Sequence, residues 1–387
     1  MRQLNFLLFF SIVLSVYGLA NFYIFIRGRQ ALTSHPTLSL IYTAVFIFLA
    51  LSYLIGRLLE RIWLSSLSDF FIFTGSFWLA AFLYLLLIVL IIDLLRIVNH
   101  FLPFFHYFTN DFGRLKLAAF TISALAVLLI LLAGYINACS VRIRRIELEI
   151  DKPCATPELK VVMASDVHLG TIVGRRRFCR IVNKINSLSP DLILFPGDLI
   201  DEDIAPVVRE NLGEALRSLK AAYGIYAVTG NHEFIGGVER AVGYLQEHGV
   251  RVLRDESVLL PNGLYLVGRD DRVKKAFTGV DRKSLGELMQ SVDPGKPILL
   301  LDHQPFELHE AAEQGVDLQL SGHTHNGQLW PLDLITRATY EQSWGYLKKG
   351  HTQYYISCGV GTWGPPIRLG SRPEIVELGL RFNPKEK

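Results

Sequence analysis

The 387-residue chain has few charged residues and few cysteines. Charged residues make up 19% of it and the formal net charge is only +3, which is too small to favour nucleic acid as a partner. No two cysteines form a C-x-x-C pair, which argues against a zinc knuckle or a dithiol redox site. An even number of cysteines permits disulfides, but the spacing gives them no support, and we expect free thiols. The cysteines are Cys139, Cys154, Cys179 and Cys358.

Hydrophobic residues, by contrast, make up half of the chain. The mean hydropathy of +0.31 is too apolar for an ordinary soluble protein. The excess lies in the first third, where four stretches approach the length of about 20 residues that a membrane-spanning helix needs. We therefore predict a four-helix transmembrane domain over residues 1–141, a linker over 142–157 and a globular domain over 158–387. The four stretches are Leu4–Ile26, Leu38–Ile55, Phe70–Ile92 and Leu117–Ile136.

The sequence specifies the orientation of these stretches in a membrane less strongly than it specifies their existence. The first begins like a signal peptide, but its apolar run continues to Ile26, so we expect it to be retained. Four spans place both termini on one side, where six basic residues face five on the other, which gives no clear bias. The arginines at 142–145 favour a multi-pass protein of the cell membrane whose globular domain is cytoplasmic. Residues 94–116, aromatic with interleaved histidines, are expected to lie at the membrane interface.

The rest of the chain alternates apolar strand-like runs with segments of helical spacing, such as Phe178–Leu188 and Val207–Leu219. This pattern predicts an α/β domain in which helices cover the outer faces of sheets. Polar groups follow five of the predicted strands, and in open α/β sheets ligands bind beyond the carboxyl ends of the strands. The groups are Asp166-Val167-His168, Gly197-Asp198, Gly230-Asn231-His232-Glu233, His303 and Gly322-His323-Thr324-His325.

These residue types are suited to binding metal. A mixture of carboxylates and imidazoles favours Mn²⁺, Fe, Zn²⁺ or Ni²⁺ over Ca²⁺ or Mg²⁺. In an extended segment alternate side chains share a face, which would bring Asp166 beside His168 and His323 beside His325. Two ions about 3.5–4 Å apart, bridged by one carboxylate, can hold a hydroxide and clamp the oxygens of a phosphoryl group for in-line attack.

In this order the groups closely resemble the signature of the calcineurin-like metallophosphoesterases, which is D-x-H, G-D, G-N-H-[DE], H and G-H-x-H. The resemblance covers about residues 158–380. It implies a four-layer α/β/β/α sandwich and two metal ions bridged by Asp198. It also implies that His232 stabilises the phosphoryl group or protonates the leaving oxygen, with Glu233 orienting it. The implied ligands are Asp166, His168, Asp198 and His325 for one ion, and Asp198, Asn231, His303 and His323 for the other.

Two further stretches, 321–331 and 359–368, resemble the membrane-associated phosphodiesterase branch of that family, although Asn326 stands where that branch is expected to have glycine. This branch includes phosphodiesterases of phospholipid-like substrates and a UDP-2,3-diacylglucosamine pyrophosphatase. The resemblance implies that Arg368 lines the site. Arg175, in the basic run 175–177, could hold a substrate phosphate or an anionic headgroup, or could simply lie at a solvated helix end.

We therefore predict a membrane-anchored phosphodiesterase or pyrophosphatase. Its substrate is expected to be lipid-linked, since tethering raises the effective concentration of a site toward substrates in the same plane. One alternative is a phosphatase or phosphodiesterase of soluble nucleotides or other small phosphoesters. Another is a membrane scaffold that keeps a metal site without turnover. No signature position is missing, which favours an enzyme over a scaffold.

Overall fold

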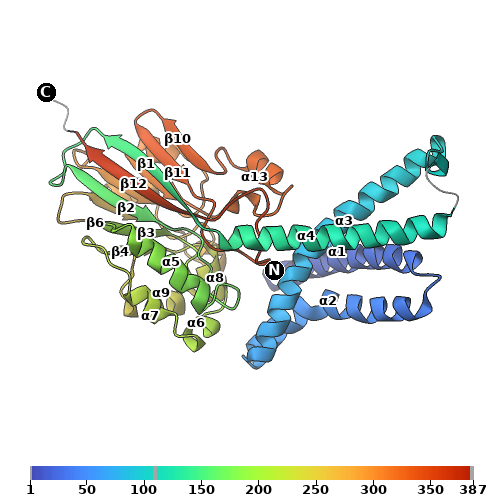
Figure 1. Cartoon of the computed structure of the whole chain (residues 1–387). Helices are drawn as coiled ribbons and strands as arrows, with labels where there is room; N and C mark the ends of the chain where they lie inside the picture. Colours follow the sequence, from blue (N-terminus) through green and yellow to red (C-terminus); the bar gives the residue numbers. More distant parts are fainter. Residues whose placement is uncertain (1, 108–110, 384–387) are drawn as a thin grey trace. The chain divides into compact units, whose positions relative to one another are not determined.

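The computed structural model describes residues 2–107 and 111–383, and the chain divides into two compact units, Met1–Gly134 and Tyr135–Lys387. Figure 1 shows the first unit as a set of long helices and the second as sheets with flanking helices. The two units differ in where their apolar side chains lie. The first exposes apolar side chains along its helices, whereas the second buries them in continuous cores.

Four helices in the first unit are long and apolar enough to cross a membrane. Each predicted stretch lies inside one of them, but the helices extend past the apolar runs into polar flanks, because a helix requires only a continuous backbone ladder. Their outward side chains, such as Leu19, Leu40 and Ile122, are more than half exposed, which suits contact with lipid. The helices are α1 (Arg2–Ala31), α2 (Pro36–Ile62), α3 (Ser66–Phe101) and α4 (Phe112–Cys139).

The stretch 94–116, predicted to be interfacial, is mainly helical where it is described. Helix α3 continues to Phe101, a 3₁₀ turn (η1) covers Phe105–Tyr107, and α4 begins at Phe112. Residues 108–110, which also belong to this prediction, lie outside the described residues.

The second unit contains two six-stranded sheets. Their strand orders are β1-β12-β2-β3-β4-β5 and β10-β11-β9-β8-β7-β6. The strands are β1 (Arg142–Ile150), β2 (Glu158–Met163), β3 (Leu192–Pro196), β4 (Ile225–Val228), β5 (Arg251–Val252), β6 (Glu256–Leu259), β7 (Tyr265–Gly268), β8 (Ile298–Leu301), β9 (Leu318–Ser321), β10 (Gly345–Lys349), β11 (Thr352–Ile356) and β12 (Glu374–Phe382). The helices are α5 (Arg175–Ser187), α6 (Ala205–Arg209), α7 (Gly213–Arg217), α8 (Asn231–Gly236), α9 (Val238–Glu247), α10 (Lys274–Thr278), α11 (Leu285–Met289), α12 (His309–Glu313), α13 (Asp333–Thr339) and the 3₁₀ turn η2 (His325–Gly327).

Three apolar clusters separate four layers. Along β3, Ile193 and Phe195 face the helices α5, α7 and α9, while Leu192 and Leu194 face the other sheet. Along β8, Leu300 faces the helices α11 and α12 on the far side. Because side chains alternate across a strand, each sheet supplies both of its faces to a core. The predicted α/β/β/α sandwich is confirmed.

Two local predictions were wrong. The stretch 142–157, expected to be a linker, contains β1, which pairs in parallel with β12 along its whole length. The alternation of apolar and polar residues that marks a strand is weak here because of the arginines, and only the side chains of Leu148 and Ile150 are buried. The single helix expected over Val207–Leu219 is divided into α6 and α7, because Asn211 adopts a left-handed φ of 51° that ends the first of them.

Candidate metal centre

The predicted ligands all lie just beyond the carboxyl ends of strands. Strands β2, β3 and β4 run parallel to one another, as do β7, β8 and β9. Their ends therefore open toward the same edge of each sheet, and the loops that follow them carry the polar groups. Asp166 and His168 follow β2, Asp198 follows β3, Asn231 and His232 follow β4, His303 follows β8, and His323 and His325 follow β9.

One group of donor atoms is formed by Asp166, His168 and His325. The Nε2 atoms of the two histidines are 3.0 Å apart, and Oδ1 of Asp166 lies 3.5 Å from Nε2 of His325. The Asp198 carboxylate borders this group, with Oδ2 3.9 Å from Nε2 of His168. Nδ1 of His168 is buried and has no hydrogen-bond partner among the described residues. The ring nitrogens and carboxylates thus converge on one small volume.

A second group contains Asp198, which borders the first, together with His303 and His323. Oδ2 of Asp198 lies 3.1 Å from Nε2 of His303, which is also 3.3 Å from Oδ1 of Asn231. That amide oxygen is in turn 2.9 Å from Nδ1 of His323. His303 donates from Nδ1 to the carbonyl of Pro196 over 2.8 Å, so its Nε2 is left to face the other donors, as in histidines that bind metal.

The chemistry of this donor set fits a cation. Oxygens of Asp198 and Asn231 can only accept hydrogen bonds, and they face imidazole nitrogens at a site that is almost completely buried. Although burial favours the neutral imidazole, the neighbouring Asp198 carboxylate holds the pKa of His303 well above its usual range. The pKa of Asp198 is held well below its usual range by His303, in spite of burial. Positive charge beside Asp198, on an imidazole or on a bound cation, therefore stabilises its buried carboxylate.

The backbone at the site is strained. Five of the seven predicted ligands have left-handed φ angles between 47° and 72°, a conformation that costs a non-glycine residue about 1–3 kcal/mol. The expectation that an extended segment aligns Asp166 with His168, and His323 with His325, was therefore wrong in mechanism. The strained residues are Asp166, His168, Asp198, His323 and His325.

Two glycines allow the loops to approach this closely. A Cβ on Gly230 would lie 2.1 Å from Oδ1 of Asp198, and one on Gly322 would lie 2.2 Å from Oδ2 of Asp166. Neither carboxylate could keep its place beside a larger residue. Gly230 and Gly322 are thus required by packing against the acidic side chains.

His232 stands beside the two groups, and Asp201 holds it. Nδ1 of His232 lies 2.9 Å from Oδ1 of Asp201, a residue that the sequence analysis did not single out. Burial opposes the charged imidazolium, but Asp198 and Asp201 raise the pKa of His232 to about 10. Glu233, expected to orient His232, instead accepts from the backbone N–H groups of Asp198, Ile200 and Gly230. It therefore joins two loops of the site.

The two arginines predicted to bind substrate are placed differently. Arg368 is completely buried. Its guanidinium donates to the Gly361 carbonyl and to Oγ of Ser371, and Nη2 lies 3.0 Å from Nδ1 of His325. These contacts hold the side chain against the His325 ring, and the role in substrate binding that the sequence suggested for Arg368 stays a prediction. Arg175 is exposed at the start of α5, where its backbone N–H donates to Glu210, and it does not join the cluster.

Comparison with known proteins agrees with this geometry. The calcineurin-like phosphoesterase family model matches residues 159–327. A metallophosphoesterase of Aquifex aeolicus is 34% identical over 264 residues, which are 65% of this chain and 97% of the relative. One of Campylobacter jejuni is 28% identical over 384 residues, 97% of this chain and 99% of the relative. A Danio rerio protein described as a transmembrane protein with metallophosphoesterase domain is 32% identical over 289 residues, 70% of this chain and 64% of the relative. That description and the four apolar helices together indicate a membrane protein.

Proposed function

Because the chain belongs to the calcineurin-like metallophosphoesterase family and is a metal-dependent phosphoester hydrolase, we propose that it is a membrane-anchored phosphodiesterase or pyrophosphatase with two metal ions and a lipid-linked substrate. The observation that carries the proposal is the pair of donor groups that meet at Asp198. A carboxylate that borders both groups is what a paired metal site requires.

The proposal divides the ligands between two ions. Asp198 would touch both, and the mixture of carboxylate, amide and imidazole donors suits Mn²⁺, Fe, Zn²⁺ or Ni²⁺. When bound, such a pair supplies Lewis acidity toward a phosphoryl group and toward water. The first ion would be held by Asp166, His168, Asp198 and His325, and the second by Asp198, Asn231, His303 and His323.

His232 is proposed as the proton donor to the leaving oxygen. Its Nδ1 is engaged by the Asp201 carboxylate, which leaves Nε2 to hold the proton that the substrate oxygen takes as the P–O bond breaks. The His232 side chain is buried, whereas that of Asp201 is 25% exposed. Asp201 would be a positioning residue, because it orients the His232 ring and does not itself contact the substrate.

A group of exposed apolar side chains beside the site supports a lipid-linked substrate. We call Trp330, Leu334, Ile335 and Trp363 the apolar rim; each of them is more than half exposed. The ring of Trp363 lies 6.2 Å from that of His232. The Gln328 side chain bonds the backbone of Trp363 at both its N–H and its carbonyl, which ties the two segments of the rim together. Indole and aliphatic side chains of this kind favour the bilayer interface.

The membrane arrangement is proposed with the same function. We propose that α1 to α4 all cross the cell membrane, which places both ends of the chain on one side. The arginines that follow α4, at 142, 144 and 145, support the cytoplasm as that side under the rule that basic residues stay inside.

The test uses the full chain in detergent micelles and two substrates with the same leaving group. These are phosphatidyl-p-nitrophenol, which is lipid-linked, and bis-p-nitrophenyl phosphate, which is not. The double substitution Leu334→Ser with Ile335→Ser is expected to lower kcat/KM about ten-fold for the lipid alone, equivalent to about 1.4 kcal/mol. Leu259→Ser, which changes an exposed leucine on β6, is the control.

The outcomes separate the alternatives. Equal losses on both substrates, or none on either, would remove the support for a lipid-linked substrate and favour a small soluble phosphoester. Absence of turnover by a metal-loaded chain on any phosphoester tried would favour the scaffold instead.

A further inference from the structure

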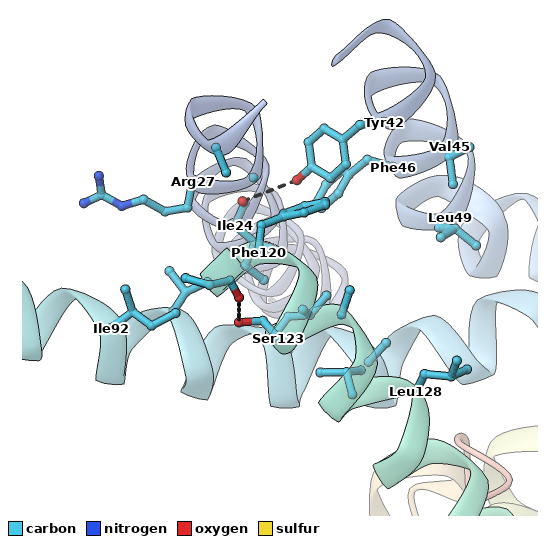
Figure 2. A pocket seen from close by; sticks show the side chains of 18 of the residues that line it. Ile24, Arg27, Tyr42, Val45, Phe46, Leu49, Ile92, Phe120, Ser123 and Leu128 are labelled. Carbon is cyan, nitrogen blue, oxygen red and sulfur yellow. Dashed lines mark hydrogen bonds between the residues drawn. The ribbon is translucent and has the colours of Figure 1, made fainter. Parts of the chain in front are cut away.

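The four helices of the first unit enclose a cavity of about 470 Å³. It is lined by residues of every one of them, and Figure 2 shows Tyr42, Phe46 and Phe120 facing one another on its wall while Arg27 extends away from them. The rings of Tyr42 and Phe46, and of Tyr42 and Phe120, are both 5.6 Å apart. The wall further from the polar residues is aliphatic and includes Leu49, Val127 and Leu131. Such a lining suits a hydrocarbon chain.

One end of this cavity carries charge. The ends of α1 and α3 and the beginning of α4 bring four charged side chains to its lining, three basic and one acidic: Arg27, Arg96, Lys116 and Asp93. Two of the bases form ion pairs with Asp93, since Nη2 of Arg27 and Nη1 of Arg96 lie 2.5 Å and 2.9 Å from its carboxylate. The hydroxyl of Tyr23 donates to the same carboxylate. One acid thus holds two bases in place and leaves an excess of positive charge.

Several donors at this end have no partner in the described part of the chain. Nε of Arg27 is buried without a hydrogen bond, and Lys116 forms neither an ion pair nor a hydrogen bond with the residues in 2–107 and 111–383. A cation at the edge of a hydrocarbon environment is costly unless an anion compensates it. The juxtaposition of an apolar cavity with three bases and one acid therefore matches an amphiphile with a negative head.

We propose that this cavity is a binding site for one anionic phospholipid. An acyl chain occupies the space between Tyr42, Phe46 and Leu128, and the headgroup phosphate is held by Lys116, which is not paired with Asp93. The site is separate from the metal centre and requires no turnover, so it stands or falls independently of the proposed enzymatic function. Neutral phospholipids share the acyl chain but lack the net charge, which is the basis of the test.

The experiment is native mass spectrometry of the full chain in detergent, titrated with phosphatidylglycerol or phosphatidylcholine of identical acyl chains. The wild type is expected to bind one phosphatidylglycerol at concentrations at which phosphatidylcholine does not bind. Lys116→Gln should weaken the first phosphatidylglycerol about five-fold, as expected for one cation near a membrane surface. Arg114→Gln is its control, because Arg114 pairs with Asp111 and does not line the cavity.

A second pair of variants tests the cavity itself. Ser123 lines it and Thr121 does not, yet both hydroxyls donate to the helix carbonyl four residues earlier. Ser123→Phe should fill the space and abolish the first binding event, whereas Thr121→Phe should leave it intact. Equal binding of the two lipids, or unchanged binding by both Lys116→Gln and Ser123→Phe, would overturn the proposal. A dimer that Ser123→Phe disrupts would assign the cavity to a second copy of the chain instead.

Discussion

The carboxylate of Asp201 lies 2.9 Å from Nδ1 of His232, with Oδ1 as the nearer oxygen. This contact fixes the one histidine of the centre that stands apart from the proposed ligands. It also determines which nitrogen of the ring is available to a substrate, because the other nitrogen is already engaged.

We predict that Asp201→Asn lowers kcat about 10²-fold toward alkyl phosphodiesters, the usual scale of a lost general acid. The loss should be much smaller with p-nitrophenyl esters, because p-nitrophenolate leaves without a proton. Steady-state kinetics on the two substrate types measures this difference. Asp203→Asn, which changes a carboxylate that bonds only the Ala205 N–H in the same loop, should alter neither. Equal losses on both substrate types would argue against a role in proton transfer.

Metal content should follow the division of the ligands. The purified wild type is predicted to hold roughly two ions per chain, His325→Ala roughly one, and Asp198→Ala close to none, since Asp198 borders both groups. Inductively coupled plasma mass spectrometry gives these ratios. His351→Ala, on an exposed turn before β11, serves as the control. A single ion in the wild type, or two in Asp198→Ala, would contradict the shared carboxylate.

Removing the metals should also destabilise the second unit. Without cations the buried carboxylates of Asp166 and Asp198 repel each other, and burial together with this repulsion raises the pKa of Asp166. At a metal concentration of about 100 times Kd the expected stabilisation is about 2.7 kcal/mol. Differential scanning calorimetry with and without chelator should therefore show a lower Tm in the chelated wild type. Asp198→Ala, which lacks the shared ligand, should show little difference.

Arg368 should behave as a positioning residue. Arg368→Lys keeps the charge but cannot span Gly361, Ser371 and His325 together. We expect metal affinity to fall about ten-fold, as for other residues that orient metal-binding histidines, while KM stays unchanged. Arg372→Lys, at an exposed position, is the comparison. A raised KM with unaltered metal binding would instead support the contact with substrate that the sequence suggested.

Gly230 should tolerate no side chain. Gly230→Ala would place a methyl group 2.1 Å from Oδ1 of Asp198, and we expect loss of both metal binding and activity. Gly243→Ala provides the matched control, because a Cβ there meets open space on α9 and alanine stabilises a helix by about 0.5–1 kcal/mol. Metal content and Tm of the two variants distinguish a local steric clash from a general effect of alanine.

Much of this site could be predicted from the sequence because its ligands occur in short groups after strand ends. Asp166 and His323 are far apart in the chain and follow strands of different sheets, yet their loops meet where the backbone N–H of His323 donates to the Asp166 carboxylate over 2.9 Å. Asp201 was missed because it follows Asp198 by three residues and matches no motif. The available signal was a second carboxylate in the same short loop.

Other features depended on tertiary contacts that local patterns do not encode. The strand β1 is fixed by pairing with β12, more than 200 residues later. The burial of Arg368 depends on the carbonyl of Gly361 and on the Ser371 hydroxyl, and the same side chain contacts His325. The left-handed backbone at the ligands follows from the loops that hold them and overrides the expected alternation.

The most direct test of the central claim is hydrolysis of bis-p-nitrophenyl phosphate by the metal-stripped full chain as Mn²⁺ is added back, beside Asp198→Ala and His232→Ala. The account predicts that activity returns with metal in the wild type and stays absent in Asp198→Ala. His232→Ala should bind metal normally and keep much of its activity on this ester, because p-nitrophenolate leaves without a proton. Full activity in stripped protein, or activity that returns in Asp198→Ala as it does in the wild type, would contradict a metal-dependent hydrolase centred on Asp198.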